Sequence, residues 1–217
     1  MRSLKLEDHN LLRDIRGSVL VETTIVLPIF LVLVLGTIDI TNMFYEWALA
    51  NKAAYIGARM AVTSNPVDPD LANLSYNSTQ IENIGQSCLV VSCPSANSVC
   101  TGAASGGSCT SGTFQNGAFT SIFDLMRRMF PRLQRQNVTI SYQTNGTGVV
   151  GQTWEGSADP GNPQFTLPMN VTVSITGMTH QFYFIAPLLQ FFGGGISATP
   201  AIPTFATTLQ SEDMFTN

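Results

Sequence analysis

An almost uninterrupted apolar run lies near the start of the chain. From Ser18 to Ile38 the sequence reads SVLVETTIVLPIFLVLVLGTI, and Glu22 is the only charged residue within it. About 20 apolar residues, at roughly 1.5 Å per residue, predict a membrane-spanning helix. Pro28 is costly in a water-exposed helix but is tolerated in a membrane. The alternatives are a cleaved secretory signal, with Ala48-Leu49-Ala50 as its cleavage site, and a buried core helix.

The helical pattern continues beyond the apolar run. Apolar residues recur at helical spacing with polar residues between them: Ile40, Phe44, Trp47, Tyr55, Ala58 and Val62. The first strong helix-breaking signal is Asn65-Pro66. Residues 19–63 are therefore predicted to form one continuous helix of about 65 Å.

The distribution of Lys and Arg around the apolar run predicts its orientation. Four basic residues precede it, namely Arg2, Lys5, Arg13 and Arg16, whereas only Lys52 and Arg59 follow soon after it. We therefore expect the N-terminal tail in the cytoplasm and the chain from about Asp39 onward outside it. The domain organisation that we predict is a leader (1–17), a transmembrane helix (18–40), its continuation (41–64) and an extracytoplasmic α+β domain (65–217).

The region after the helix alternates polar and apolar residues in the manner of strands. Residues 138–143 and 171–176 show this period of two, and residues 119–133 form an amphipathic helix pattern that ends near Pro131. Residues 196–208 are predicted to form the last strand, and Pro200 and Pro203 limit it to an edge or irregular strand because proline cannot donate a ladder hydrogen bond. The fold class is thus α+β: a long helix followed by a mainly antiparallel sheet. The apolar segment 182–192 is either sheet core or a surface for a neighbouring subunit or the membrane.

All four cysteines fall in one stretch of the polar region: Cys88, Cys93, Cys100 and Cys109. An even number on the side predicted to be extracytoplasmic indicates disulfides. Three pairings are possible, and we favour the local pairs Cys88–Cys93 and Cys100–Cys109. These disulfides would restrain a flexible segment that has little hydrophobic core of its own. A metal site would need closely spaced ligand pairs such as CxxC, or nearby His, so no metal is predicted.

Composition narrows the function further. Charged residues are only 11% of the chain, and the net charge of −4 argues against a nucleic-acid-binding protein. Apart from His9, His180 is the only histidine, and neither GxSxG nor a phosphate-binding loop occurs. We therefore expect no enzyme, no cofactor and no small-molecule substrate. One basic patch, formed by Arg127, Arg128, Arg132 and Arg135, is expected to be a solvated face or a contact for anionic headgroups or an acidic neighbour.

The beginning of the apolar run carries a second signal. The string R-GSVLVE places Gly17 after Arg16 and puts Glu22 five residues after Gly17. It resembles the processing site of type IV-like prepilins, where a membrane peptidase cuts after the glycine. Cutting between Gly17 and Ser18 would create a free amine four positions before Glu22, on the same helix face. In an apolar environment each charge needs a partner, so an amine and a glutamate of neighbouring subunits would satisfy one another and set the axial register.

Residues 16–62 as a whole resemble the TadE-like family, pseudopilins of the tight-adherence (Tad, Flp) pilus. The matching positions are Gly17, Glu22, Pro28, Gly36, Asp39 and Tyr45, followed by Ala53, Ala54, Gly57, Ala58, Arg59 and Ala61. Thr23 departs from the pattern, because the family often has an aromatic residue there. The small residues from Ala53 onward suggest close helix packing, either on the chain's own domain or on another subunit.

The resemblance implies a function, a location and a set of partners. It implies a bacterial minor pseudopilin in the inner membrane with a periplasmic domain, possible incorporation into the extracellular pilus and a role in cell adhesion. The implied partners are membrane lipid, a prepilin peptidase, other pilins or pseudopilins and the inner-membrane assembly platform. The alternative is an unprocessed, single-pass anchored protein that serves as an extracytoplasmic binding or scaffold protein.

Overall fold

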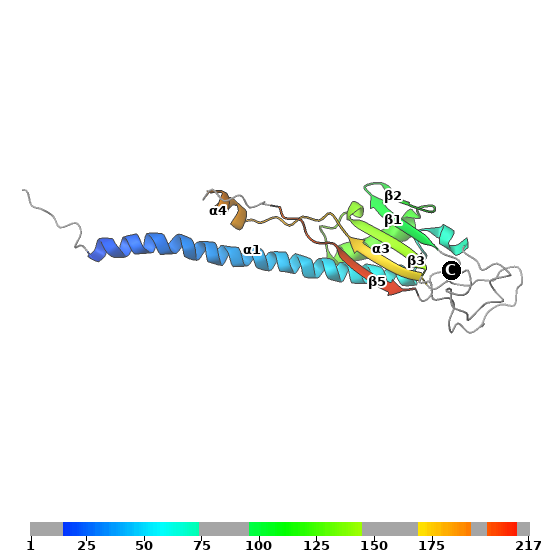
Figure 1. Ribbon diagram of the computed structural model, residues 1–217, viewed down its shortest axis with the longest axis horizontal. Coiled ribbons are helices and arrows are strands. Elements are labelled where there is room, and N and C mark those ends of the chain that lie inside the picture. Colours follow the sequence, from blue (N-terminus) through cyan, green and yellow to red (C-terminus); the bar gives the residue numbers. More distant parts are fainter. Residues whose placement is uncertain (1–14, 74–95, 145–168, 192–198, 212–217) are drawn as a thin grey trace, which may run out of the picture. The chain divides into compact units, whose positions relative to one another are not determined.

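The computed structural model describes residues 15–73, 96–144, 169–191 and 199–211 (Figure 1). In chain order the elements are α1 (Ile15–Thr63), η2 (Pro69–Asn73), β1 (Asn97–Ala103), β2 (Gly106–Cys109), α3 (Asn116–Met129), η3 (Arg135–Asn137), β3 (Val138–Thr144), β4 (Met169–Ile175), α4 (Ile185–Phe191) and β5 (Phe205–Gln210). The predicted α+β class is confirmed. The chain divides into two compact units: one is Met1–Met43 with Gln181–Pro200, and the other is Phe44–His180 with Ala201–Asn217.

Helix α1 confirms the predicted continuous helix of residues 19–63. It begins at Ile15, includes Pro28 in its interior and ends at Thr63, just before Asn65-Pro66. A residue that precedes proline is disfavoured in the helical region, which explains why the helix ends here. The helix belongs to the first unit as far as Met43 and to the second from Phe44 onward.

The sheet lies in the second unit, and its described strands are all antiparallel in the order β2-β1-β3-β4-β5. The predicted strands at 138–143 and 171–176 are confirmed by β3 and β4, whose side chains alternate between buried and partly exposed. The period of two puts the apolar residues of each strand on one face. Val138 pairs with Ile175 and Ile140 with Val173, which brings these apolar side chains together across the two strands.

One face of the sheet forms a single hydrophobic core with the second half of α1 and with α3. Phe119, Ile122, Phe123 and Met126 of α3 are buried. The predicted amphipathic segment 119–133 is helical from 119 to 129, and the observed helix begins at Asn116 and ends at Met129. The opposite face carries hydroxyl groups that bond across strands. Thr172 and Thr208 lie 2.7 Å apart, and Thr101 and Thr139 lie 3.4 Å apart. The sheet therefore has one apolar and one polar face, as is usual for an antiparallel sheet covered on one side.

The segment around the last two cysteines is ordered, in contrast to our expectation of a floppy stretch. Residues 97–109 form the β1–β2 hairpin, and Gly106 adopts a φ of 99° at its turn, a conformation that suits glycine. Glycine and serine have little intrinsic preference for strands. The hairpin is held instead by tertiary pairing, because β1 also pairs with β3 from Asn97 to Thr101.

The described part of the apolar segment, residues 182–191, is not sheet core. Residues Ile185–Phe191 form α4, which belongs to the first unit rather than to the unit that contains the sheet. Pro187 lies in the first turn of α4, where an N–H group has no helical partner to lose, whereas in a central strand it would remove a ladder hydrogen bond. The last strand is Phe205–Gln210, shorter and later than predicted, and it lies at the sheet edge as expected.

Candidate functional site

The first half of α1 exposes its apolar side chains. Leu20 is 70% exposed, Val21 63% and Leu33 63%, and most of the large side chains between Val19 and Ile40 are similarly accessible. Among the described residues, α1 is the one helix long and apolar enough to cross a membrane. Exposed apolar surface of this extent is unfavourable in water, so this half of the helix requires lipid or other apolar helices around it.

Glu22 is the polar exception in this surface. The hydroxyls of Thr23 and Thr24 bond to carbonyl oxygens one turn earlier, at 2.8 and 2.6 Å, and so need no outside partner. The Glu22 side chain is exposed and has no hydrogen-bonding or ionic partner among the residues that the structure describes. Gly17 and Ser18 lie in the first turn of α1, where backbone N–H groups lack helical partners.

The second half of α1 has the opposite character. Its small residues form a fully buried stripe: Ala50, Ala53, Ala54, Ala58 and Ala61. A Cβ placed on Gly57 would come within 2.5 Å of the Met126 sulfur, so α3 approaches the helix backbone closely. Of the two partners considered for the small residues, the chain's own domain is the one that these side chains contact.

Glu46 lies where the helix enters the second unit and is 8% exposed. One carboxylate oxygen pairs with the Arg132 guanidinium, and the other lies 2.6 Å from Nδ1 of the buried His180. Arg132 also donates to the carbonyl of Thr179 at 3.3 Å. A carboxylate removed from water needs such partners, so this trio ties α1 to the segments after α3 and β4.

Asp39 is buried as well, although it lies in the apolar half. The carboxylate accepts backbone N–H groups from Tyr183 at 3.3 Å and from Phe184 and Ile185 at 2.8 Å each. These donors include the first residue of α4, whose N–H groups have no helical acceptor. Asp39 thus caps α4 from a different segment, and all four residues belong to the first unit.

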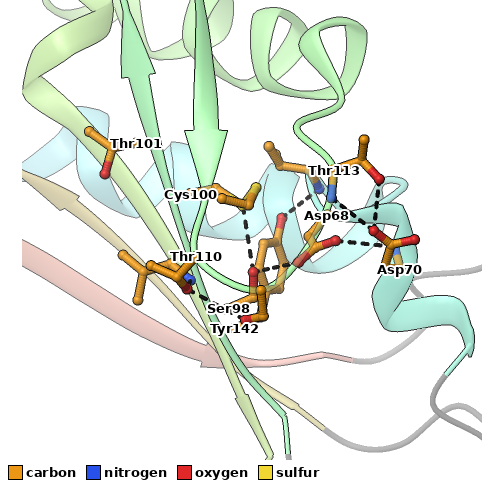
Figure 2. Close-up of a disulfide and its surroundings, with 12 residues drawn as sticks. Asp68, Asp70, Ser98, Cys100, Thr101, Thr110, Thr113 and Tyr142 are labelled. Carbon is orange, nitrogen blue, oxygen red and sulfur yellow. Dashed lines mark hydrogen bonds between the residues drawn. A yellow bond between two sulfur atoms is a disulfide. The ribbon is translucent and has the colours of Figure 1, made fainter.

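A third buried carboxylate, Asp68, lies between the end of α1 and the sheet (Figure 2). Its Oδ2 accepts the Ser98 hydroxyl at 2.5 Å, and its Oδ1 accepts the Asp70 N–H at 3.1 Å. Nearby, the Tyr142 hydroxyl accepts the N–H of Val67 at 3.0 Å. These bonds fix the segment after the helix to β1 and β3.

The Cys100–Cys109 disulfide borders this cluster and confirms one of the two favoured pairs. The residues face one another directly across β1 and β2. Cys88 and Cys93 lie outside the described residues. Ligand atoms of Asp68, Cys100 and Cys109 lie within 4.8 Å of one another, but both sulfurs are taken up by the disulfide and do not form a thiolate metal site.

Two groups near Asp68 have altered acidity. The Thr113 hydroxyl and N–H bond to the Asp70 carboxylate at 2.7 and 2.8 Å and hold the pKa of Asp70 below its usual value. Burial raises the pKa of the Tyr142 phenol far above its usual value, and the negative charge of Asp68 acts in the same direction. The Val67 N–H opposes this shift but does not outweigh it.

The predicted basic patch is divided by the structure. Arg132 bonds to Glu46. The Arg135 guanidinium lies 4.8 Å from the Phe119 ring centroid. It also donates hydrogen bonds to the side-chain oxygens of Thr120 at 2.9 Å and Asn116 at 2.5 Å. Arg127 and Arg128 are exposed. Two of the four arginines therefore hold the domain together and do not form part of a free cationic face.

Sequence reasoning identified Glu22 and Asp39 by position but did not foresee the role of Asp39 as a cap. It missed Glu46 and Asp68 entirely. A charge on the apolar side of an amphipathic helix was a usable signal for Glu46, since it follows Met43 by three positions and precedes Ala50 by four. Asp68 carried no such signal, because it stands in a proline-rich loop.

The comparison with protein families gives one match. A family model described as TadE-like protein matches residues 17–59, which confirms the resemblance over that segment. No curated protein and no solved structure matches the chain. The matched segment contains Gly17, Glu22 and Asp39, together with the apolar half of α1 and most of its buried alanine stripe.

Proposed function

We propose that this chain is a minor pseudopilin of a Tad-type (type IVb, Flp) pilus. The coarser part, a membrane protein related to the Tad pilus, follows from the TadE-like match and the apolar helix. The finer part rests on one observation: Glu22 is the single charged residue of the apolar run 18–38, and it projects from α1 without a partner among the described residues. A carboxylate in that position is best stabilised by a cation from another molecule.

The proposed chemistry is proteolysis followed by charge pairing. A prepilin peptidase cleaves the bond between Gly17 and Ser18 and leaves a protonated amine at Ser18. This amine of one subunit meets the Glu22 carboxylate of its neighbour, while the exposed apolar side chains pack among other pilin helices or lipid. Support comes from the position of the bond in the first helical turn, where few backbone hydrogen bonds must break before a peptidase can act.

The remaining assignments follow the same scheme. The N-terminal tail faces the cytoplasm, the sheet-containing domain lies in the periplasm, and other pilins and the inner-membrane assembly platform are its partners. A disulfide between Cys100 and Cys109 suits an oxidising compartment. The proposal includes no catalysis: His180, on which a hydrolytic site would depend, is 1% exposed and bonded to Glu46.

Mass spectrometry of the mature N-terminus tests the proposal directly. In cells that contain the pilus system, we expect a chain that begins at Ser18. Replacing Gly17 with leucine should block cleavage, whereas Gly36→Ala, where the added carbon meets Ile185 at an ordinary 3.6 Å, should leave it intact. A wild-type chain that retains the residues before Ser18 would instead support an unprocessed anchored scaffold.

A second variant separates cleavage from assembly. Glu22→Gln keeps the shape of the side chain but removes its charge, so we expect normal membrane insertion and loss of co-purification with other pilus subunits. Glu22→Asp, which retains the charge, is the matched control. Undiminished co-purification of the glutamine variant would contradict the charge-pairing role.

A further inference from the structure

The segment Gln181–Phe191, which we name the aromatic arm, is an excursion from the domain. Thr179 forms a bridge with Ala201, and the N–H of Ile202 donates to the carbonyl of Met178 at 2.8 Å. The chain therefore leaves the second unit and returns to it at one place. Residues 181–200 belong to the first unit together with the apolar half of α1.

The aromatic arm is apolar and uncharged. From Gln181 to Ser211 the sequence contains no Asp, Glu, Lys, Arg or His. Two aromatic side chains of the arm are exposed, Tyr183 to 57% and Phe184 to 42%. Tyrosine is enriched where a membrane meets water, because its ring is apolar and its hydroxyl is polar.

Asp39 fixes the arm at one level of α1. This residue is the first charged position after the apolar run that ends at Ile38. Asp39 is 1% exposed, and its carboxylate accepts the backbone N–H groups of Tyr183, Phe184 and Ile185. One turn earlier along α1 lies Gly36. A Cβ atom added to Gly36 would be 3.6 Å from the Ile185 side chain, so the arm contacts the helix there as well. The arm thus lies beside the last turns of the apolar half, within the same unit.

This level is where the edge of a bilayer would lie. Residues 18–38 extend for about 31 Å as a helix, close to the thickness of a hydrocarbon core of roughly 30 Å. A free carboxylate at that boundary would be poorly accommodated against the apolar side. Three N–H donors offset that cost and at the same time hold two exposed aromatic rings at the boundary.

We infer that the aromatic arm is a membrane-interface element, with Tyr183 and Phe184 inserted among the lipids at the Asp39 end of the span. The inference rests on the membrane anchoring in the proposed function. Lipid is favoured over a protein partner because the surface is continuous with the exposed apolar half of α1 and carries no charge that would select one partner. Asp39 acts as a positioning residue, since it contacts the arm backbone and not the lipid.

Photo-crosslinking in lipid nanodiscs tests the inference on the full chain. Tyr183 is replaced by p-benzoylphenylalanine, and the protein is reconstituted in phosphatidylethanolamine and phosphatidylglycerol. After irradiation, lipid adducts are counted by intact-protein mass spectrometry. The same probe at Leu27, which is 53% exposed in the apolar half, is the positive control, and the probe at the exposed Gln210 of β5 is the negative control.

We expect the adduct yield at position 183 to be within about twofold of that at Leu27 and on the order of tenfold above that at Gln210. Lipid adducts at Leu27 but not at position 183 would overturn the inference and leave membrane anchoring intact. Crosslinks from position 183 to a second protein would also overturn it and would identify a subunit contact instead. Absence of lipid adducts at Leu27 would count against anchoring itself.

Asp39 provides a second measurement. Asp39→Ala removes the acceptor of the three N–H groups, so we expect lipid adducts at position 183 to fall at least threefold, while those at Leu27 stay unchanged. Asp39→Asn keeps an acceptor oxygen and should restore part of the yield. An unchanged yield at position 183 in the alanine variant would refute the positioning role of Asp39.

Discussion

The two halves of α1 form one continuous helix but differ in which side chains they bury and which they expose. The first half, Ile15–Met43, presents large apolar side chains outward and carries a glutamate, Glu22, that lacks a partner in the described chain. The second half, from Phe44 to Thr63, buries small residues in a core and carries Glu46, which has two partners. Burial of small residues stabilises one domain from within, whereas exposure of large ones commits a helix to an apolar environment.

The two glutamates give the sharpest test of this contrast. Glu46→Ala removes the carboxylate that bonds to the buried His180 and to Arg132, so we expect the second unit to lose about 2–4 kcal/mol in its free energy of unfolding. Glu22→Ala should change that free energy by less than about 0.5 kcal/mol. Urea unfolding of the full chain in detergent, followed by tryptophan fluorescence, measures both. Equal losses in the two variants would show that the halves do not differ in this way.

The alanine stripe gives the next largest effect. Ala54 is fully buried, so Ala54→Leu must displace neighbouring side chains and should destabilise the second unit by about 1–3 kcal/mol. Ala48 lies on the same half of the helix but is exposed, and Ala48→Leu is expected to be nearly neutral. Both variants change helix propensity by the same amount, because both replace alanine with leucine. The difference between their urea midpoints therefore measures the effect of overpacking the buried stripe.

Alkaline pH gives the smallest effect and concerns the second unit alone. The pKa of Tyr142 is raised above its usual 10.0, so above pH 10 the unfolded chain loses this proton while the folded chain keeps it. Stability is therefore fully present below pH 10 and falls above it, by up to about 1.4 kcal/mol per pH unit. Tyr142→Phe should flatten this decline while it costs about 1 kcal/mol at neutral pH through the lost bond to Val67. An unchanged slope in the variant would assign the alkaline loss to another group.

The sequence predicted secondary structure best where apolar residues recur with a regular period or form a long continuous run. Hydrophobic periodicity predicted α3, β3, β4 and the second half of α1, because each buries a face that its own residues define. The first half of α1 was predicted from the length of its apolar run. The hairpin β1–β2 escaped prediction, since its glycines and serines have little strand preference and its stability comes from pairing with β3. The run 182–192 was ambiguous between core and surface, because a short apolar stretch has no diagnostic period.

Most contacts of the buried carboxylates could not be predicted from the sequence. Glu46 and His180 are separated by 134 positions, and nothing in either local sequence indicates the other. Asp39 could be located through its resemblance to a family position, but its function as a cap depends on the return of residues 183–185 to the helix. Predicting such pairs requires the tertiary fold. Processing after Gly17 and the domain boundaries stay predictions.

The disulfide also fixes the register of the β1–β2 hairpin. Cys100 and Cys109 meet only when each stands directly opposite the other, and Cys109 is the last residue of β2. A slip of one position would turn one sulfur to the opposite side of the sheet, where the two thiols could not react. The Cys100–Cys109 bond therefore holds the register in which these two residues face each other, and a register displaced by one residue cannot be held by the same bond.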